Sequence, residues 1–329
     1  MTVPSTPLPR ERVGVMLPRD LPAAQVLPFA RRAEELGFDE LWVVEDLGFR
    51  GGVAQAGAVL AATERIVVGI GIMPAGARNP AFAAMELATL AQLFPGRLIA
   101  GIGHGMPVWM RQVGAWPASP LTFIGEYATA VRALLRGGPG PANGRYVTTE
   151  DVVIGETPDL VPPVVLGVRG PRSLEVAGRV ADGVLLAEPS PPAYIASALG
   201  HMGATPGAEG VEVIAYDVAV VDDDPDAAVE RARAGLTWIG EPDWAPHLAA
   251  LPFADELARH RRQCGGPEEF AATMPTEWVA ELALAGTPDQ VRERVAARYR
   301  AGATSVVLTP VEADRTAALT RLARVLGRR

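Results

Sequence analysis

Histidine is the side chain best suited to moving protons near neutral pH, and one of the four histidines of this chain has an unusual setting. His104 belongs to the segment GIGHG at 101–105, in which alternate glycines leave space beside the chain. We therefore predict a catalytic role for His104, with a histidine packed in the core as the alternative. We expect His201, His247 and His260 to be surface residues.

Two adjacent acids, Glu45 and Asp46, follow the apolar run LWVV at 41–44. A carboxylate in this position can accept hydrogen bonds from a cofactor ring or a substrate, and it can exchange a proton with a reacting group. Helix capping or a solvated loop would explain the same pair, so both interpretations stay open.

Two further segments place glycine near the end of an apolar run. Glycine within IVVGIGI at 66–72 is typical of a bulge, of close approach to a ligand, or of packing inside a narrow barrel. The segment GVRGPR at 167–172 leads into a helix, whose free N–H groups and dipole favour an anion such as phosphate. Arg169 or Arg172 would add charge-assisted hydrogen bonds, and a tight turn without a ligand is the alternative.

All 30 basic residues are arginine, because the sequence contains no lysine. A Schiff-base lysine, a phosphate-loop lysine and a lysine general base are therefore excluded. The single cysteine excludes an internal disulfide and a thiolate-rich metal site, and it fits a reducing compartment. The sequence contains no HExxH motif, and we expect no metal.

The net charge of −8 and the isoelectric point near 5.2 argue against a nucleic-acid partner. No run reaches the roughly 18 uncharged apolar residues that a membrane span needs. Residues 1–14 contain no long apolar run, so we expect no signal peptide. Together these features predict a soluble, cytoplasmic protein without a membrane partner.

The candidate residues follow short apolar runs that alternate with helical segments. Cap signals predict several helices: Gly37 closes 22–36, Asn79 and Pro80 begin the helix that ends near 94, and Thr287 begins a capping box. We predict eight strands, at 12–17, 41–44, 66–72, 98–102, 164–168, 183–187, 211–221 and 305–308. This α/β alternation predicts parallel strands, and eight repeats favour closure into a (β/α)8 TIM barrel.

No low-complexity block or linker divides the chain, so we predict a single domain over 1–329. Insertions are expected after strands four and seven, the second being mostly helical at about 237–285. Residues 137–162, rich in Gly, Pro and Thr, are expected to form a long loop or small hairpin. The C-terminal strand ends of such a barrel carry the active site, which would bring the candidate residues together.

Four segments, in this order, resemble the bacterial luciferase-like superfamily: LWVVED, ATERIVVGIGIMPAGARNP, LATLAQLFPGRLIAGIGHG and PVVLGVRGPRSLEVAGRVADGVLL. The segment TPDQVRERVAARYRAGATSVVL near the end of the chain also fits. Within that superfamily the nearest resemblance is to oxidoreductases that use the deazaflavin coenzyme F420. The resemblance implies a (β/α)8 barrel, in agreement with the strand count.

The resemblance also implies where a cofactor would lie. The family has a non-proline cis peptide in a bulge of strand three, which backs the cofactor ring, and the matching bond joins Gly71 and Ile72. The cofactor phosphate of the family lies on the amides after strand five. The cofactor-binding residues predicted in this way are Glu45, Gly71, Ile72, Gly103, Gly167, Val168, Arg169 and Gly170.

The chain departs from the family pattern at two strand ends. Strand two of the family usually ends in an Asp-His pair, whereas Glu45 and Asp46 stand here. The sugar-phosphate dehydrogenase branch has a glutamate where Met106 stands, and it uses lysines that this chain lacks. We therefore do not expect that branch's substrate, and His104, Glu45 and Asp46 remain the catalytic candidates.

These observations predict an oxidoreductase that moves a hydride between coenzyme F420 and a small-molecule organic substrate at the barrel mouth. The alternative is an FMN-dependent two-component monooxygenase that receives reduced flavin from a partner reductase. A third interpretation is a protein that binds flavin or deazaflavin without turnover. Without lysine, an anionic cofactor tail would be held by arginine and backbone amides, first of all Arg169 and Arg172.

The tryptophans suggest what lines the substrate pocket. Trp109, Trp116, Trp238 and Trp244 predict an apolar pocket, although packing within the insertion would explain them as well. We expect a homodimer, which the family commonly forms through helices of its first half. The apolar helices at 53–62 and 80–94 suit such an interface, with full burial inside the monomer as the alternative.

Overall fold

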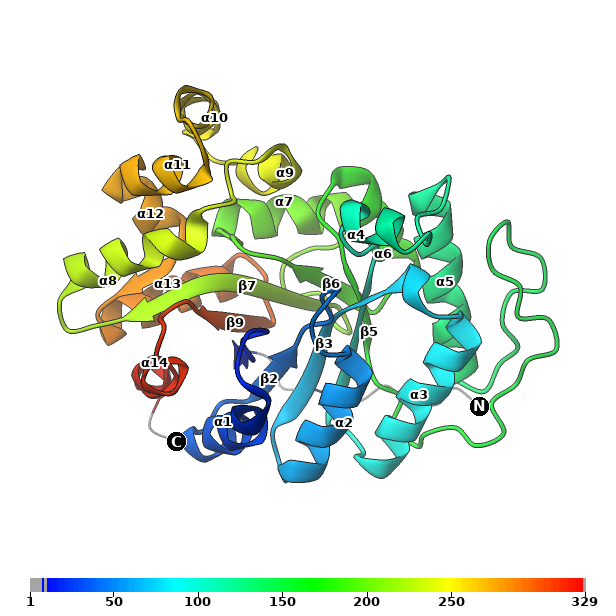
Figure 1. Cartoon of the computed structure of the whole chain (residues 1–329). Helices are drawn as coiled ribbons and strands as arrows, with labels where there is room; N and C mark the ends of the chain where they lie inside the picture. Colours follow the sequence, from blue (N-terminus) through cyan, green and yellow to red (C-terminus); the bar gives the residue numbers. More distant parts are fainter. Residues whose placement is uncertain (1–7, 9–10, 328–329) are drawn as a thin grey trace.

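Eight parallel strands close into a barrel in the computed structural model, which describes residue 8 and residues 11–327 (Figure 1). The strands pair in the order β6-β5-β4-β3-β2-β1-β9-β7, and a further pairing of β6 with β7 completes the ring. The predicted (β/α)8 barrel is thereby confirmed. The barrel strands are β1 (Arg12–Met16), β2 (Glu40–Val43), β3 (Val67–Pro74), β4 (Leu98–Gly103), β5 (Val164–Gly167), β6 (Gly183–Leu186), β7 (Glu212–Val221) and β9 (Ser305–Pro310).

Helices surround the barrel (Figure 1). The capping residues predicted from the sequence begin or end three of them. Gly37 adopts a left-handed φ of 92° after α1, the Asn79 side chain accepts from the Ala81 amide, and Thr287 forms the capping box. The surrounding helices are α1 (Ala23–Leu36), α2 (Gly52–Ala62), α3 (Pro80–Leu93), α5 (Pro120–Leu135), α6 (Pro171–Val180), α7 (Pro192–Met202), α8 (Pro225–Ala232), α13 (Pro288–Arg300) and α14 (Arg315–Leu322).

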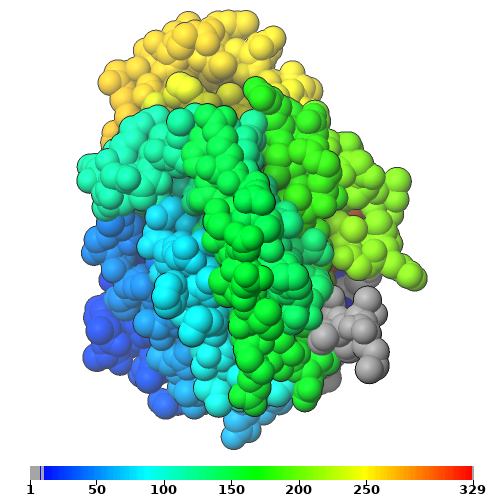
Figure 2. All heavy atoms as spheres, turned by 90° about the vertical axis from the view of Figure 1, so that its right-hand side faces the viewer, coloured from blue at the N-terminus to red at the C-terminus, as the bar shows by residue number. Residues whose placement is uncertain are grey.

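The extra elements follow β4 and β7. After β4 comes α4 (Pro107–Gln112), and after α8 comes a mostly helical segment that forms a cap at one end of the molecule, yellow and orange in Figure 2. Residues 137–162 run as an irregular loop. The cap contains η2 (Arg233–Leu236), η3 (Pro242–Trp244), α9 (Ala245–Leu248), α10 (Ala254–Gln263), α11 (Pro267–Thr273), α12 (Thr276–Leu282) and β8 (Leu284–Gly286).

The short strand β8 was not among the eight strands expected from the sequence. It pairs with the end of β7, where Ala219–Val221 face Leu284–Gly286. The 10-residue β7 is longer than its neighbours, so its last residues offer a free edge beyond the barrel. Because β8 has only three residues, its sequence carries too little pattern to separate it from the helical segment before it.

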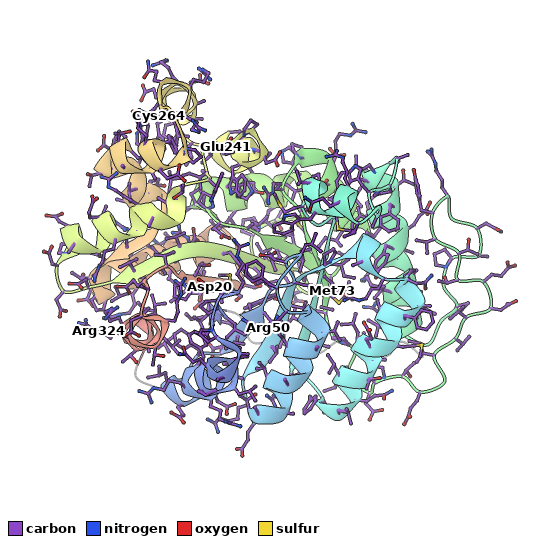
Figure 3. The ribbon with its side chains drawn as sticks, viewed as in Figure 1. Asp20, Arg50, Met73, Glu241, Cys264 and Arg324 are labelled. Atoms are coloured by element: carbon purple, nitrogen blue, oxygen red, sulfur yellow. The ribbon has the colours of Figure 1, made fainter. Side chains whose placement is uncertain are left out.

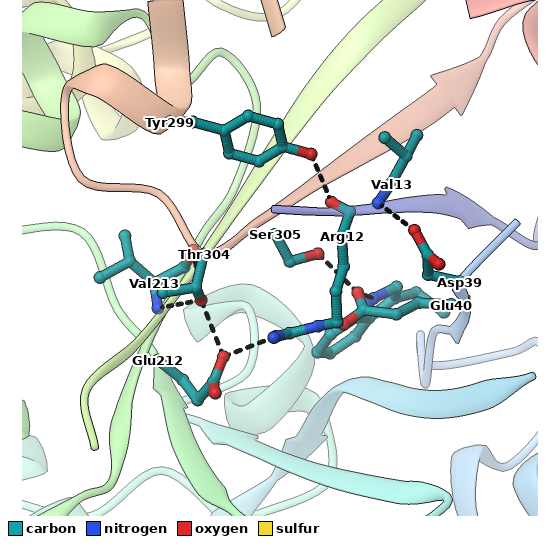
Figure 4. Close-up of polar contacts among 10 residues, drawn as sticks. Arg12, Val13, Asp39, Glu40, Glu212, Val213, Tyr299, Thr304 and Ser305 are labelled. Carbon is teal, nitrogen blue, oxygen red and sulfur yellow. Dashed lines mark hydrogen bonds and ion pairs between the residues drawn. The ribbon is translucent and has the colours of Figure 1, made fainter. Parts of the chain in front are cut away.

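A buried polar network fills the end of the barrel at which the strands begin (Figure 4). Arg12 forms ion pairs with Glu40 and with Glu212, the latter at 2.6 Å. The second oxygen of Glu40 accepts from Trp42 Nε1 at 2.8 Å and from Ser305 Oγ at 2.5 Å. This network compensates its buried charges and places Trp42 in the middle of the barrel, beneath the opposite end.

None of the helices among the described residues combines the length and the apolarity that crossing a bilayer requires. Most of residues 1–14, on which the expected absence of a signal peptide rests, lie outside the described part of the chain.

Candidate functional site

A cavity of about 1250 Å³ opens where the barrel strands end. Seven of the barrel strands contribute lining residues from their C-terminal ends or from the loops that follow, β7 contributes Tyr216 from its middle, and the cap contributes Trp238 and Trp244. Asp20 and Arg50, labelled in Figure 3, lie on the side formed by β1 and β2. This is the end of a (β/α)8 barrel at which active sites form, and the volume exceeds what one drug-sized ligand needs.

The bulge predicted in strand β3 forms the floor of the cavity. The register of β3 against β4 shifts between Ile70 and Met73, and the Gly71–Ile72 peptide is cis, as expected. A Cβ added to Gly103 or Gly167 would lie within 3.0 Å of the Ile72 side chain. The glycines at the ends of β4 and β5 therefore make room for Ile72, whereas the sequence suggested that alternate glycines leave open space.

Aromatic side chains support the bulge from below. A Cβ on Gly71 would lie within 3.0 Å of the Tyr216 hydroxyl, and the Tyr216 ring meets Trp42 edge-on at 5.6 Å. The Tyr216 hydroxyl is buried, and no described residue forms a hydrogen bond with it. Burial, together with the carboxyl of Glu188, holds the pKa of Tyr216 well above its ordinary value. An orphaned buried hydroxyl that lines a cavity is a natural partner for a ligand.

Both acids at the end of β2 line the cavity, and both form ion pairs. Glu45 Oε1 lies 2.7 Å from Arg78 Nη2, and Glu45 Oε2 accepts from the Gly52 amide at 3.2 Å. Asp46 lies 2.7 Å from Arg19 Nη1. The Arg78 contact ties the loop after β2 to the loop after β3, and the Arg19 contact ties it to the loop after β1, so each carboxylate already has a cationic partner.

His104 opens into the cavity beyond the end of β4, which distinguishes it from a core histidine. Its Nε2 lies 3.5 Å from Ser173 Oγ, and its ring centroid lies 6.4 Å from that of Trp116. Burial lowers the pKa of His104 below its ordinary value. The imidazole is therefore neutral at neutral pH and can donate or accept one hydrogen bond toward a ligand.

The predicted anion site lies where β5 leads into α6. Residues 167–170 line the cavity at the N-terminus of α6, where backbone N–H groups favour an anion. The guanidinium of Arg169 lies over the Trp244 ring at 4.8 Å and donates to the Asp243 carbonyl at 3.2 Å. Arg169 therefore also fastens the cap to the barrel. Arg172 is exposed on α6 and does not line the cavity, so of the two predicted arginines Arg169 is the one that faces it.

The sequence interpretation missed the loop after β6. Glu188 follows this strand, lines the cavity and carries a carboxyl whose pKa is raised by burial. It is joined to Pro189 by a cis peptide. The signal was present, because Glu188 directly follows the predicted strand 183–187, in the same way as Glu45 follows strand two.

His247 is a second surprise, because it was expected on the surface and is fully buried. It stacks on Tyr194 at 4.5 Å, and its Nδ1 lies 3.0 Å from the Pro189 carbonyl oxygen, to which it must donate. Burial and the nearby charge of Arg169 lower the pKa of His247 to about 3. A neutral histidine from the cap thus fixes the loop that carries Glu188; His201 is exposed and His260 half-buried.

The tryptophans and the arginines predicted near the site can now be located on the cavity wall. Trp109, Trp116, Trp238 and Trp244 all line the cavity, whose wall therefore includes four indole rings. The arginines that line it, besides Arg169, are Arg19, Arg50 and Arg315. No cluster of three or more His, Cys, Asp or Glu within the described ranges is arranged to hold a metal ion.

These features fit an extended cofactor with a flat ring and an anionic tail. The bulge offers a backbone surface for a ring, the Tyr216 hydroxyl offers an unused hydrogen-bonding group, and the N-terminus of α6 offers amides for a phosphate. Of the four lining arginines, Arg50 and Arg169 form no ion pair with a described residue, and they supply positive charge that a chain without lysine requires.

Known proteins share this sequence and architecture. Residues 8–305 match the family model described as luciferase-like monooxygenase. The chain is 27% identical to the 5,10-methylenetetrahydromethanopterin reductase of Methanopyrus kandleri, over 92% of this chain and 94% of that protein. It is 28% identical to the F420-dependent glucose-6-phosphate dehydrogenase of Microbacterium testaceum, over 84% of this chain and 83% of that protein.

Solved structures agree on the fold. A coenzyme F420 dependent tetrahydromethanopterin reductase from Methanopyrus kandleri superposes with a TM-score of 0.79 at 23% identity, over 95% of this chain and 97% of that one. The oxygenating constituent of 3,6-diketocamphane monooxygenase from Pseudomonas putida, in complex with FMN, gives 0.67 at 16% identity, over 95% and 96%. By sequence and by barrel, the chain belongs to the luciferase-like monooxygenase family.

Proposed function

We propose that this protein is an oxidoreductase that transfers a hydride between coenzyme F420 and an organic substrate bound at the mouth of the barrel. The observation that carries the proposal is the bulge of β3 at Gly71 and Ile72, which forms the floor of a cavity bounded by the N-terminus of α6. The choice of a deazaflavin follows the relatives whose names include F420.

Each part of the cavity has a task in this proposal. The bulge supports one face of the cofactor ring, with Gly103 making room behind it for Ile72. Glu45 contacts the ring from the end of β2, and the amides of residues 167–170 with Arg169 hold the phosphate. The bound deazaflavin supplies the carbon that gives or takes a hydride, while the protein orients the partners and excludes water.

Side chains near the ring contact the reacting groups. Among the three candidates named from the sequence, His104 has no ionic partner, whereas Glu45 and Asp46 are each paired with an arginine. We therefore assign His104 the more direct contact with the reacting groups. Glu45 and Asp46 then act by fixing the loops around the ring.

The substrate differs from that of the sugar-phosphate branch. Met106 stands where that branch has its glutamate, and the arginines at the mouth already have partners, such as Asp46 for Arg19 and Asp20 for Arg315. The four indole rings of the cavity wall instead suit a largely apolar organic molecule with a reducible group.

Fluorescence titration of the purified protein with coenzyme F420 and with FMN tests the proposal. Saturable F420 binding, followed by oxidation of reduced F420 by members of a carbonyl and enone panel, is the expected result. Tight FMN binding without F420 binding would instead identify a two-component monooxygenase that needs a partner reductase. F420 binding without turnover of any acceptor would identify a binding protein.

A homodimer belongs to the same proposal. Helix α3 presents three exposed apolar side chains, Phe82 at 64%, Met85 at 52% and Leu93 at 67% exposure. This face is not buried inside the monomer, and it lies in the first half of the chain. Phe82→Asp should convert a dimer into a monomer in light scattering, and an unchanged mass would reject this interface.

A further inference from the structure

We propose that Glu188 is a further catalytic residue, which exchanges a proton with the substrate during hydride transfer while His104 forms a hydrogen bond with the substrate. This inference rests on the proposed function and extends it to a side chain at the end of β6. It starts from the place of Glu188 on the cavity wall, beside the Tyr216 hydroxyl and the Gly71–Ile72 bulge.

The carboxyl of Glu188 differs from the other carboxylates of the inner cavity because it has no ionic partner. Glu45 is paired with Arg78 and Asp46 with Arg19. No other described residue forms a hydrogen bond or an ion pair with the Glu188 side chain. A carboxyl group in this state remains available to a ligand.

The surroundings of Glu188 favour the protonated form. Burial raises its pKa most, the negative charges of Asp217 and Asp46 raise it further, and Arg169 lowers it. The hydroxyl of Tyr216 is the other titratable group beside it, and this hydroxyl stays neutral. Glu188 can therefore donate a proton at a pH at which a surface glutamate is ionised.

Three contacts hold the backbone of residues 188–190, the loop that carries Glu188. Trp244 Nε1 donates to the Glu188 carbonyl at 3.1 Å, and His247 Nδ1 donates to the next carbonyl. The Ser190 amide donates to Asp217 Oδ1 at 3.0 Å, and Asp217 forms a buried ion pair with Arg298. Such fixed backbone supports keep a catalytic carboxyl in one position relative to the bulge.

The chemistry balances for the reduction of a carbonyl group. A hydride adds to the carbonyl carbon, the C=O π bond breaks, and its electron pair moves onto oxygen. That oxygen forms a bond to the proton of Glu188, whose O–H bond breaks and leaves the carboxylate. The substrate is reduced, the reduced deazaflavin that gave the hydride is oxidised, and Glu188 recovers its proton from solvent at the mouth.

Glu188→Gln removes the acid while keeping its size, and Glu209→Gln, on an exposed loop, is the matched control. With an acceptor from the carbonyl and enone panel, Glu188→Gln should lower kcat at least 100-fold, with KM and the F420 dissociation constant within threefold of wild type. The wild-type rate should fall as the pH rises through the pKa of Glu188, and the residual rate of the variant should lose this dependence. Glu188→Asp should restore part of kcat.

A readout without turnover separates this inference from the proposed function. In carbon-detected NMR of the ligand-free protein, the side-chain carboxyl signal that disappears in Glu188→Gln should titrate at higher pH than the signal of Glu209. Titration together with surface glutamates overturns the inference, whether or not F420 binds. Wild-type kcat in Glu188→Gln, or a tenfold loss of F420 affinity, also overturns it, whereas failure of F420 to bind the wild type overturns the proposed function.

Discussion

The two ends of the barrel treat buried polar groups in opposite ways. At the end where the strands begin, Arg12 lies between Glu40 and Glu212, and Glu40 also accepts from Ser305 (Figure 4). At the end where the strands finish, the Tyr216 hydroxyl has no described partner. Complete pairing stabilises a fold, and incomplete pairing around a cavity marks the place where a ligand completes the set.

Removal of Arg12 should give the largest loss of stability. Arg12→Met leaves Glu40 buried without its cation, so the free energy of unfolding should fall by about 3–5 kcal/mol. Urea denaturation measures the change. Arg300→Met breaks an exposed ion pair with Glu293 and should change little. A stable Arg12→Met protein would show that the network does not hold this end together.

At the cavity end of the barrel, the buried His247 of the cap should make the stability of the protein sensitive to acid. The folded protein holds the pKa of His247 at about 3 instead of 6.5, so the unfolded chain gains a proton first as the pH falls through this window. Stability should therefore decrease with falling pH, by up to about 1.4 kcal/mol per pH unit.

Thermal unfolding of wild type and His247→Gln at pH 7 and pH 4.5 checks this, since glutamine keeps a donor for the Pro189 carbonyl. The variant should lose less stability than wild type on acidification. The exposed His201→Gln is the control, and equal acid sensitivity of all three proteins would remove His247 from the explanation.

His104→Ala tests the catalytic end directly. Turnover should fall about 100-fold with F420 affinity and melting temperature nearly unchanged, because the ring faces the cavity. The fluorescence titration and a steady-state assay measure the two effects separately. An unfolded variant would favour the core-packing alternative.

Gly167→Ala should disturb the floor of the cavity. The added methyl group meets the Ile72 side chain, so we expect a loss of about 1–3 kcal/mol in stability and weaker F420 binding. Gly155→Ala, where an added Cβ meets open space, controls for the stability effect. Unchanged F420 affinity in Gly167→Ala would mean that the bulge does not support the ring.

The smallest expected change in stability comes from removing the Tyr216 hydroxyl, and removal of the Ser305 hydroxyl provides the comparison. Tyr216→Phe should leave the free energy of unfolding within about 0.5 kcal/mol of wild type, because no hydrogen bond is lost. Ser305→Ala deprives Glu40 of a hydrogen bond and should cost about 1–3 kcal/mol. Urea denaturation of both variants gives the comparison, which equal losses would contradict.

The sequence predicted the barrel part of the site better than the part that the cap contributes. The barrel, its caps and the Gly71–Ile72 peptide followed from apolar runs, cap residues and family motifs, because these are local patterns. His247 and the contact of Arg169 with Trp244 depend on how the cap docks on the barrel, which no local pattern encodes. That Arg169 faces the cavity while Arg172 points outward from the first turn of α6 is likewise not readable from the segment GVRGPR.

The packing of Ile72 against Gly103 and Gly167 has a consequence for sequence variation. A larger residue at 167 meets only the Ile72 side chain and fits together with a smaller residue at 72, whereas at 103 it also meets the Gly167 carbonyl oxygen. Positions 72 and 167 should therefore covary among relatives that keep this floor, and position 103 should stay glycine. A relative with alanine at one of the glycine positions and isoleucine at 72 must shape the floor of its cavity differently.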